Sequence, residues 1–174
     1  MTETTPVVWL MGPTSAGKTT LAAALSDRLR AESDAPVLHW DGDQIRDMLG
    51  DGLGFSSDSR LLVVRTLATV ALASSQAGVL TLVSALTAHD DARQLIRDML
   101  PDLLVVYVKC SLETCMERDP KGLYAQAAAG EIDTLIGYNS DYISPQNADL
   151  ILDTSTENID ACVGRLVGFL DGQA

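Results

Sequence analysis

The feature that most constrains the fold of this chain is an eight-residue segment near its start, Gly12-Pro13-Thr14-Ser15-Ala16-Gly17-Lys18-Thr19. It matches G-x-x-x-x-G-K-[ST], a phosphate-binding loop between a buried strand and a helix. An apolar run at 7–11 precedes it, and a helix-forming run at 20–25 follows. Glycines permit the tight turn that points successive N–H groups at phosphate oxygens, and the helix N-terminus adds its positive dipole. The segment therefore predicts a nucleotide site within a strand–loop–helix unit.

We expect this loop to hold ATP. Lys18 can reach the β- and γ-phosphates, and the Thr19 hydroxyl can bind the Mg²⁺ that accompanies them. Lys18 is also expected to act in catalysis by stabilising charge on the transferred group. The residues expected to contact ATP are Gly12, Pro13, Thr14, Ser15, Ala16, Gly17, Lys18, Thr19 and Thr20.

Strand-like and helix-like segments alternate along the rest of the chain. Apolar runs typical of buried strands occur at 7–11, 36–40, 79–84, 103–109 and 149–152. Helical patterns occupy 18–31, 57–76, 90–100, a short stretch from Leu112, and 159–170. This alternation predicts an α/β fold in which a five-stranded parallel sheet carries helices on both faces.

The chain of 174 residues is expected to form a single domain, with 1–6 as a flexible N-terminus. A long irregular stretch, 119–147, is rich in Gly, Pro, Tyr, Asn and Ser. In compact domains a segment of this length is often a mobile lid or a binding loop. We therefore predict that about 118–147 form a lid and an acceptor-side loop.

Charge and cysteine content narrow the class of partner. The chain has 24 acidic and 12 basic side chains and a formal net charge of −12, which disfavours nucleic acid and membrane surfaces as partners. It has no apolar stretch long enough to cross a bilayer. Its three cysteines show neither metal-ligand spacing nor a disulfide pattern. We expect a cytoplasmic protein.

The remaining sequence separates the classes that share such a loop. A GTPase would need a guanine-reading N-K-x-D segment, which the chain lacks, and a motor or ATPase normally has a strand that ends in Asp. The third predicted strand ends Leu82-Val83-Ser84-Ala85 instead. A small chain with a lid-like segment is typical of a small-molecule kinase.

Two carboxylates follow the second predicted strand, in Asp41-Gly42-Asp43-Gln44-Ile45-Arg46. Ligands of open parallel sheets bind beyond the carboxyl ends of strands, so Asp41 and Asp43 should share a crevice with the phosphate loop. A carboxylate there can accept the proton of an attacking hydroxyl or hold magnesium-bound water, and Arg46 can hold an anionic acceptor. Alternatively, Asp43 caps a helix that begins at Gln44.

These segments, taken in order, resemble adenylylsulfate kinases. Besides the phosphate loop and 41–46, the resemblance includes Leu53-Gly54-Phe55-Ser56 with Arg60, and Glu117-Arg118-Asp119-Pro120-Lys121-Gly122-Leu123-Tyr124. It continues through 129–132, Gly137, 141–142 and Pro145, and ends at Leu150-Ile151-Leu152-Asp153-Thr154. The resemblance implies a P-loop kinase fold and transfer of the ATP γ-phosphoryl group to the 3′-hydroxyl of adenylylsulfate.

The resemblance also assigns roles to individual residues. Asp41 would be the catalytic carboxylate and, with Thr19, would organise Mg²⁺, while Lys121 would act in catalysis from the lid. Arg118 would lie near the base of ATP. The residues implied to bind the acceptor are Asp43, Arg46, Phe55, Arg60, Thr87, Lys121 and Leu123. Phe55 offers a stacking face, and the arginines offer forked donors for phosphate or sulfate oxygens.

The chain departs from the family pattern mainly in the half of the site that would read the acceptor. Gln44 and Val63 stand where the family has Asn, and 85–90 reads A-L-T-A-H-D in place of F-I-S-P-x-R. If Asp90 faces the acceptor, a less anionic molecule would suit the site better. If Asp90 faces solvent, adenylylsulfate is still accepted.

Three functions follow from this pattern. The first is an ATP-dependent adenylylsulfate kinase. The second is a related kinase that acts on another nucleotide conjugate or a secondary metabolite. The third is a nucleotide-binding regulator without catalysis, against which the intact Lys18, Asp41 and Lys121 argue. The apolar face of 61–72 fits packing against the sheet or a homodimer interface.

Overall fold

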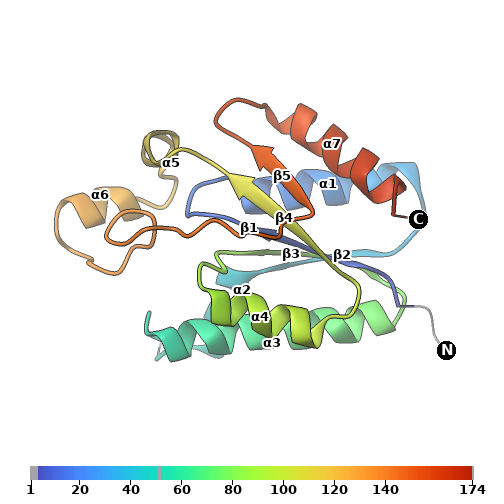
Figure 1. Cartoon of the computed structure of the whole chain (residues 1–174), viewed down its shortest axis with the longest axis horizontal. Helices are drawn as coiled ribbons and strands as arrows, with labels where there is room; N and C mark the ends of the chain where they lie inside the picture. The colour runs from blue at the N-terminus through green and yellow to red at the C-terminus, as the bar shows by residue number, and fades with distance from the viewer. Residues whose placement is uncertain (1–3, 51, 174) are drawn as a thin grey trace.

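The computed structural model describes residues 4–50 and 52–173, which fold around one parallel sheet (Figure 1). Its strands are β1 (Val7–Met11), β2 (Val37–Asp41), β3 (Leu80–Ala85), β4 (Leu103–Lys109) and β5 (Leu150–Asp153). Its helices are α1 (Lys18–Glu32), α2 (Gly42–Leu49), α3 (Ser57–Gln76), α4 (Asp90–Met99), α5 (Leu112–Arg118), α6 (Leu123–Ala128) and α7 (Ile159–Asp171).

The sheet has the strand order β2-β3-β1-β4-β5, and all of its strand pairs are parallel. The central strand β1 is buried along its whole length, as the continuous apolar run at 7–11 predicts. The predicted α/β class with five parallel strands is therefore confirmed. The sheet positions the site because the carboxyl ends of parallel strands open on the same edge.

Helices cover both faces of the sheet (Figure 1): α1 and α7 lie on one side, and α2, α3 and α4 on the other. Successive β1 side chains enter opposite cores, so that Leu10 packs on the α1 side and Trp9 on the α3 side. The face of α3 that carries Val64, Leu67 and Ala71 is buried in this second core. The predicted packing of the 61–72 face against the sheet is confirmed.

The segment around 118–147 extends beyond the carboxyl ends of the strands, where Figure 1 shows α5 and α6 apart from the two helical layers. It contains one short helix, α6, within the stretch expected to be irregular. Among the described residues, no helix is long and apolar enough to cross a membrane.

The alternative interpretation, in which Asp43 caps a helix, is wrong. The helix after β2 begins at Gly42, and its N-cap is Asp41, whose Oδ1 accepts a hydrogen bond from the Asp43 N–H at 2.8 Å. Asp43 therefore lies in the first turn and does not cap a helix that begins at Gln44. A carboxylate in the cap position satisfies an N–H group that has no partner within the helix.

Candidate active site

The loop between β1 and α1 has the strained backbone of a phosphate cradle. Gly17 has φ 95°, which favours glycine, and Ser15 has φ 64°. A Cβ atom on Gly12 would lie 2.2 Å from the carbonyl oxygen of Val108, so the loop can approach β4 only with glycine at this position. Lys18 Nζ donates to the Pro13 carbonyl at 2.7 Å, which folds the lysine back over the loop.

Asp41 lies at the carboxyl end of β2, only 6% exposed, beside this loop. Its Oδ2 accepts hydrogen bonds from Thr19 Oγ1 and from Ser84 Oγ, each at 2.6 Å. Burial opposes ionisation of Asp41, but the hydrogen bonds from Ser84, Thr19 and the Asp43 N–H outweigh it and lower its pKa. The carboxylate is thus held charged and oriented at the base of the cleft.

Lys18 sits in a mixed electrostatic environment. Burial lowers its pKa to about 8, although the carboxylates of Asp43 and Asp41 act in the opposite direction. Without a bound anion, the Lys18 ammonium group therefore loses its proton more readily than an exposed lysine does. A bound phosphate would favour the charged form of Lys18 and would itself be stabilised by it.

A cleft of about 1450 Å³ extends from the loop along the edge of the sheet, which is large enough for two nucleotide-sized ligands. It brings together most of the predicted site residues: Thr14, Ser15, Gly17, Lys18, Thr19, Thr20, Asp41, Asp43, Arg46, Phe55, Arg60, Thr87, Arg118, Lys121 and Leu123. Gly12, Pro13 and Ala16 are the buried residues of the loop itself and do not line the cleft.

The end of the cleft away from the loop contains arginine and aromatic groups. The Arg46 guanidinium lies over the Phe55 ring, 4.9 Å from its centroid, and Nη1 donates to the Gly54 carbonyl at 2.9 Å. Arg60 Nη2 donates to the Thr134 carbonyl at 2.8 Å, which connects α3 to the lid. Phe55 is 58% exposed, so its ring can receive a planar ligand.

The loop between β3 and α4 forms another wall of the cleft. Thr87 is buried with φ 40°, and its Oγ1 accepts a hydrogen bond from Trp9 Nε1 at 2.9 Å. Arg93 Nε donates to the Thr87 carbonyl at 3.0 Å, which holds the loop from behind. The Thr87 hydroxyl thus has a structural partner at the cleft wall, while Val63 contributes an apolar surface nearby.

Asp90 does not line the cleft. Its side chain is 87% exposed, and Oδ1 pairs with Arg93 Nη1 at 3.2 Å in the first turn of α4. The structure therefore favours the second of the two interpretations, in which Asp90 faces solvent. The charge of this residue gives no reason to expect a less anionic acceptor.

The lid contacts both sides of the cleft. Lys121 Nζ pairs with Asp43 Oδ2 on α2, and the Tyr124 hydroxyl donates to the Thr14 carbonyl at 3.0 Å. At the opposite rim, Arg118 Nη1 donates to Thr154 Oγ1 at 3.2 Å, and Thr154 Oγ1 donates to the Ala16 carbonyl at 2.7 Å. The lid and the segment after β5 are thereby both tied to the phosphate loop.

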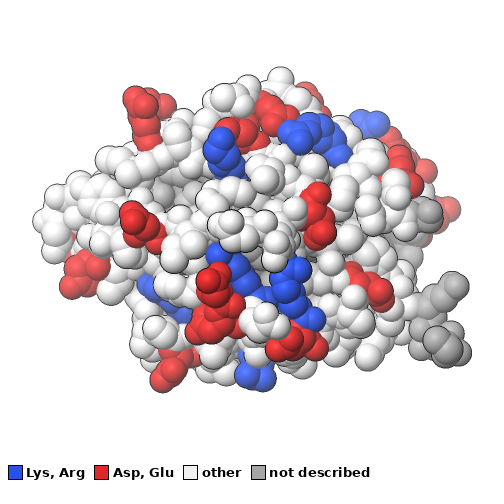
Figure 2. Space-filling model, viewed as in Figure 1, with Lys and Arg blue, Asp and Glu red and all other residues white. Residues whose placement is uncertain are grey.

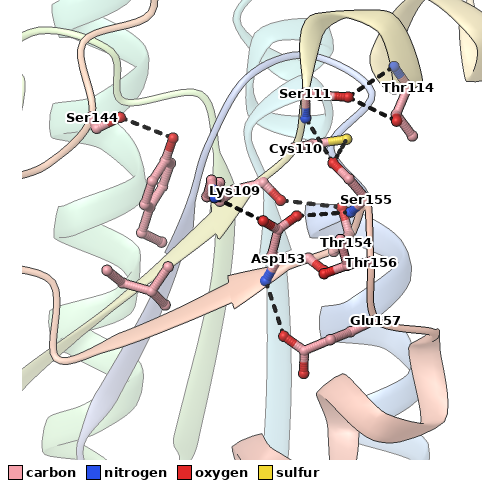
Figure 3. A network of polar contacts seen from close by, with 12 residues as sticks. Lys109, Cys110, Ser111, Thr114, Ser144, Asp153, Thr154, Ser155, Thr156 and Glu157 are labelled. Carbon is pink, nitrogen blue, oxygen red and sulfur yellow. Dashed lines mark hydrogen bonds and ion pairs between the residues drawn. The ribbon is translucent and has the colours of Figure 1, made fainter.

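Beside that rim, polar contacts join the ends of β4 and β5 (Figure 3). Lys109 Nζ pairs with Asp153 Oδ2 at 2.8 Å, and the Ser111 N–H donates to Ser155 Oγ at 2.8 Å. These contacts fix the start of α5 relative to Thr154. On the face drawn in Figure 2, acidic and basic side chains are interspersed, so this face has no extended surface of one sign.

Several residues of the cleft were not predicted from the sequence. Ser84 is one of them, although it pairs in register with Asp41 across β2 and β3. Leu135 and Ile136 of the lid and Asn158 at the start of α7 also line the cleft. The position of Ser84 at the carboxyl end of the third strand could have indicated it, but only if the pairing of the second and third strands had been known.

The fold and the site define a P-loop kinase. The family model described as adenylylsulphate kinase matches residues 4–153, and the chain belongs to this family. An adenylyl-sulfate kinase of Vibrio vulnificus is 40% identical over 163 residues, covering 92% of this chain and 78% of the relative. One from Halothermothrix orenii is 38% identical, covering 94% of this chain and 88% of the relative.

Solved structures agree with this assignment. The Mycobacterium tuberculosis APS kinase CysC, in complex with AMPPNP and APS, superimposes with a TM-score of 0.90 at 34% identity, covering 97% of this chain and 98% of that chain. A shikimate kinase from Aquifex aeolicus shares the fold alone, with a TM-score of 0.54 at 17% identity over 96% of this chain and 97% of that chain. The family predicted from the motifs is confirmed; the roles of individual site residues stay predictions.

Proposed function

We propose that this protein is an adenylylsulfate kinase, which transfers the γ-phosphoryl group of ATP to the 3′-hydroxyl of adenylylsulfate. The observation that carries the proposal is the position of Asp41. Its buried carboxylate lies between the phosphate loop and the part of the cleft lined by Arg46, Phe55 and Arg60. A nucleotide bound at each end would bring its reacting group to this carboxylate.

In the proposed reaction, Asp41 orients the acceptor hydroxyl and accepts its proton as the new P–O bond forms. Lys18 stabilises negative charge on the β- and γ-phosphates, and Lys121 adds positive charge from the lid. Lys121 must leave Asp43 to do this, which gives the lid a second position to occupy. Catalysis thus consists of positioning and charge stabilisation, together with exclusion of water by 118–147.

The donor groups in the cleft fit Mg²⁺. The Thr19 hydroxyl and the Asp41 carboxylate place oxygen atoms 2.6 Å apart beside the phosphate loop, and oxygen is the ligand type that this cation prefers. Mg²⁺ is commonly held by one or two protein groups plus phosphates and water. Bound there, it would neutralise charge on the ATP phosphates, with Thr19 and Asp41 as its protein partners.

The proposed acceptor rests on two features of the far end of the cleft. Arg46 and Arg60 supply cationic groups suited to an anionic nucleotide, and Phe55 supplies an exposed ring for its base. Val63 is the one feature that favours a related nucleotide conjugate instead, because a valine cannot donate or accept a hydrogen bond where an amide could. This alternative keeps the same chemistry and changes only the acceptor.

The test is ATP-dependent phosphorylation of adenylylsulfate by the purified protein, with product identified by mass spectrometry. Turnover should fall about 10²- to 10⁴-fold in Asp41→Asn, because the amide cannot accept the proton. Asp90→Asn is a matched control that removes one carboxylate outside the cleft, and it should leave turnover unchanged. ATP binding without turnover of adenylylsulfate would contradict the proposed acceptor. If the protein binds ATP but phosphorylates no nucleotide conjugate, the result would support a regulatory nucleotide-binding protein.

We also propose that the single kinase domain forms a homodimer. Two apolar side chains on the outer surface of α2 and α3 support this: Met48 is 74% exposed and Leu62 is 45% exposed. Burial of such side chains between two copies would remove apolar surface from water. Sedimentation equilibrium should give a dimer in the wild type and a monomer in the Met48→Lys/Leu62→Lys variant.

A further inference from the structure

A polar chain crosses the otherwise apolar face of the sheet beneath α1 and ends at Asp41. His39 and Asp41 are two residues apart on β2, so both side chains project to this face. Ser84 lies opposite Asp41 in the register of β2 and β3, with Leu82 opposite His39. The neighbouring side chains on this face, Leu10 and Leu82, are fully buried apolar groups. A serine and a histidine among these apolar side chains therefore need hydrogen-bond partners.

The single hydroxyl proton of Ser84 fixes the direction of these hydrogen bonds. Ser84 is 2% exposed and has one hydroxyl proton, which it donates to Asp41 Oδ2 at 2.6 Å. Its contact with His39 Nε2, at 2.8 Å, must then use a lone pair of the Ser84 oxygen. His39 is consequently the donor, in the tautomer that carries its proton on Nε2. The order of donation is His39 to Ser84 to Asp41.

The direction matters because a serine hydroxyl can rotate. While His39 donates to the Ser84 oxygen, the Ser84 proton points away from His39 and toward the carboxylate. Asp41 Oδ2 also accepts a hydrogen bond from Thr19 Oγ1 at 2.6 Å, and Oδ1 accepts one from the Asp43 N–H at 2.8 Å, so three contacts together fix the rotation of the carboxylate plane. An acceptor hydroxyl requires a carboxylate in one orientation, since small misplacements of reacting groups are costly.

We propose that His39 is a positioning residue for phosphoryl transfer, which acts through Ser84 to hold the Asp41 carboxylate in its reactive orientation. His39 itself touches no substrate, because it does not line the cleft. The inference rests on the proposed function only for the role of Asp41. The chain of hydrogen bonds can be measured without it.

The kinetic test uses two substitutions at one position. His39→Leu removes the donor at similar volume, whereas His39→Gln keeps an N–H group at nearly the same distance from the backbone. We expect kcat for adenylylsulfate to fall about tenfold in His39→Leu, with KM for ATP changed less than twofold, and to recover within about threefold of wild type in His39→Gln. An unchanged kcat in His39→Leu, or no recovery in His39→Gln, would overturn the proposal.

A double-mutant comparison separates positioning from packing. Ser84→Ala breaks the same chain with a small change in volume, so it should lower kcat by a similar factor. His39→Leu/Ser84→Ala should then be no slower than the slower single variant, because both changes interrupt one connection. Losses that multiply in the double variant would show independent effects and would overturn the proposal. Circular dichroism and the melting temperature of each variant confirm folding.

Nuclear magnetic resonance provides a readout that does not depend on turnover. Two-bond ¹H–¹⁵N spectra of the wild-type protein should show His39 as the Nε2–H tautomer, and Ser84→Ala should alter its Nε2 shift. An Nδ1–H tautomer would overturn the proposed chain whatever the kinetics. Wild-type protein that is inactive on adenylylsulfate but shows the Nε2–H tautomer would contradict the proposed function and leave the His39 contact supported.

Discussion

Gly12 illustrates how a single position can determine whether the nucleotide site forms. A Cβ atom there would lie 2.2 Å from the Val108 carbonyl oxygen, a backbone atom of β4 that cannot rotate away. We expect Gly12→Ala to displace the phosphate loop, to abolish measurable ATP binding and to destabilise the protein by about 1–3 kcal/mol. Calorimetric ATP titration and urea denaturation measure the two effects.

The control for this substitution is Gly164→Ala on the exposed side of α7, where an added Cβ would meet nothing within 4 Å. Alanine is favoured over glycine in a helix interior by about 0.5–1 kcal/mol. Gly164→Ala should therefore raise stability and leave ATP binding unchanged. If Gly12→Ala binds ATP as tightly as Gly164→Ala, the close approach to β4 does not shape the loop.

The cysteines differ in reactivity because their surroundings differ. Burial raises the pKa of the Cys115 thiol to about 12, and the adjacent Cys110 adds to the shift. At pH 8 the Cys115 thiol would then stay protonated, whereas the thiolate is the form that reacts. Iodoacetamide at pH 8 should modify the half-buried Cys110 and spare Cys115, as mass spectrometry would reveal.

The control for labelling is the same reaction in denaturant, where all three cysteines should react. Modification of native Cys115 at the rate of Cys110 at pH 8 would be inconsistent with a buried, protonated thiol.

Single positions differ in how far the sequence alone could predict them. The phosphate loop was predictable because its geometry follows from local residue order, with glycines where the backbone turns and Lys18 one position later. Ser84 was not, because its contact with Asp41 arises only when β2 and β3 pair in register. The direction in which Asp90 points was likewise left open, since it depends on the first turn of α4 and on Arg93.

At the scale of elements, strand positions followed the apolar runs to within one residue, because strands buried on both faces need such runs. Helix starts were less certain. The sequence left open whether Asp43 caps a helix, because Asp41 and Asp43 are both good capping residues, and only the backbone contact to the Asp43 N–H shows that Asp41 is the cap. The short α6 lies in a stretch whose composition indicates irregular structure, and its position depends on lid contacts with the phosphate loop.

Tyr124 of α6 joins the lid to the phosphate loop. The ring of Tyr124 is 2% exposed, and its hydroxyl donates to the Thr14 carbonyl at 3.0 Å. Tyr124→Phe keeps the ring and removes this bond, whose loss costs about 1 kcal/mol of folding stability. We expect the melting temperature to fall by about 2–4 °C in differential scanning fluorimetry, because the bond is already present without a ligand.

The neighbouring Tyr138 provides a matched control, because its ring packs edge-on against Tyr124 with centroids 6.3 Å apart and is 38% exposed. Tyr138→Phe removes a hydroxyl from the same lid without touching the phosphate loop, and it should melt within about 1 °C of wild type. Equal destabilisation in both variants would indicate a general loosening of the lid in place of a specific contact.

At the scale of the whole molecule, the cleft lies where all its parts meet. The sheet edge supplies the phosphate loop and Asp41, and α3 supplies Arg60. The lid contacts the phosphate loop through Tyr124, α2 through Lys121 and α3 through Thr134. A ligand in the cleft therefore touches elements from both cores of the protein. Such a ligand binds only the folded state, so its binding free energy adds to the stability of the entire chain.

Binding of ATP should therefore raise the melting temperature of the protein. ATP at about 100 times its Kd should stabilise the protein by about 2.7 kcal/mol, which for a chain of this size raises the melting temperature by about 5–10 °C. Lys18→Met should lose most of this increase, because Lys18 contacts the phosphates in the proposed site. Lys109→Met removes an equal charge at the carboxyl end of β4 from a residue that does not line the cleft and pairs with Asp153 at 2.8 Å, and it should keep the full increase. Differential scanning fluorimetry measures all three proteins, and equal increases in both variants would place ATP away from the phosphate loop.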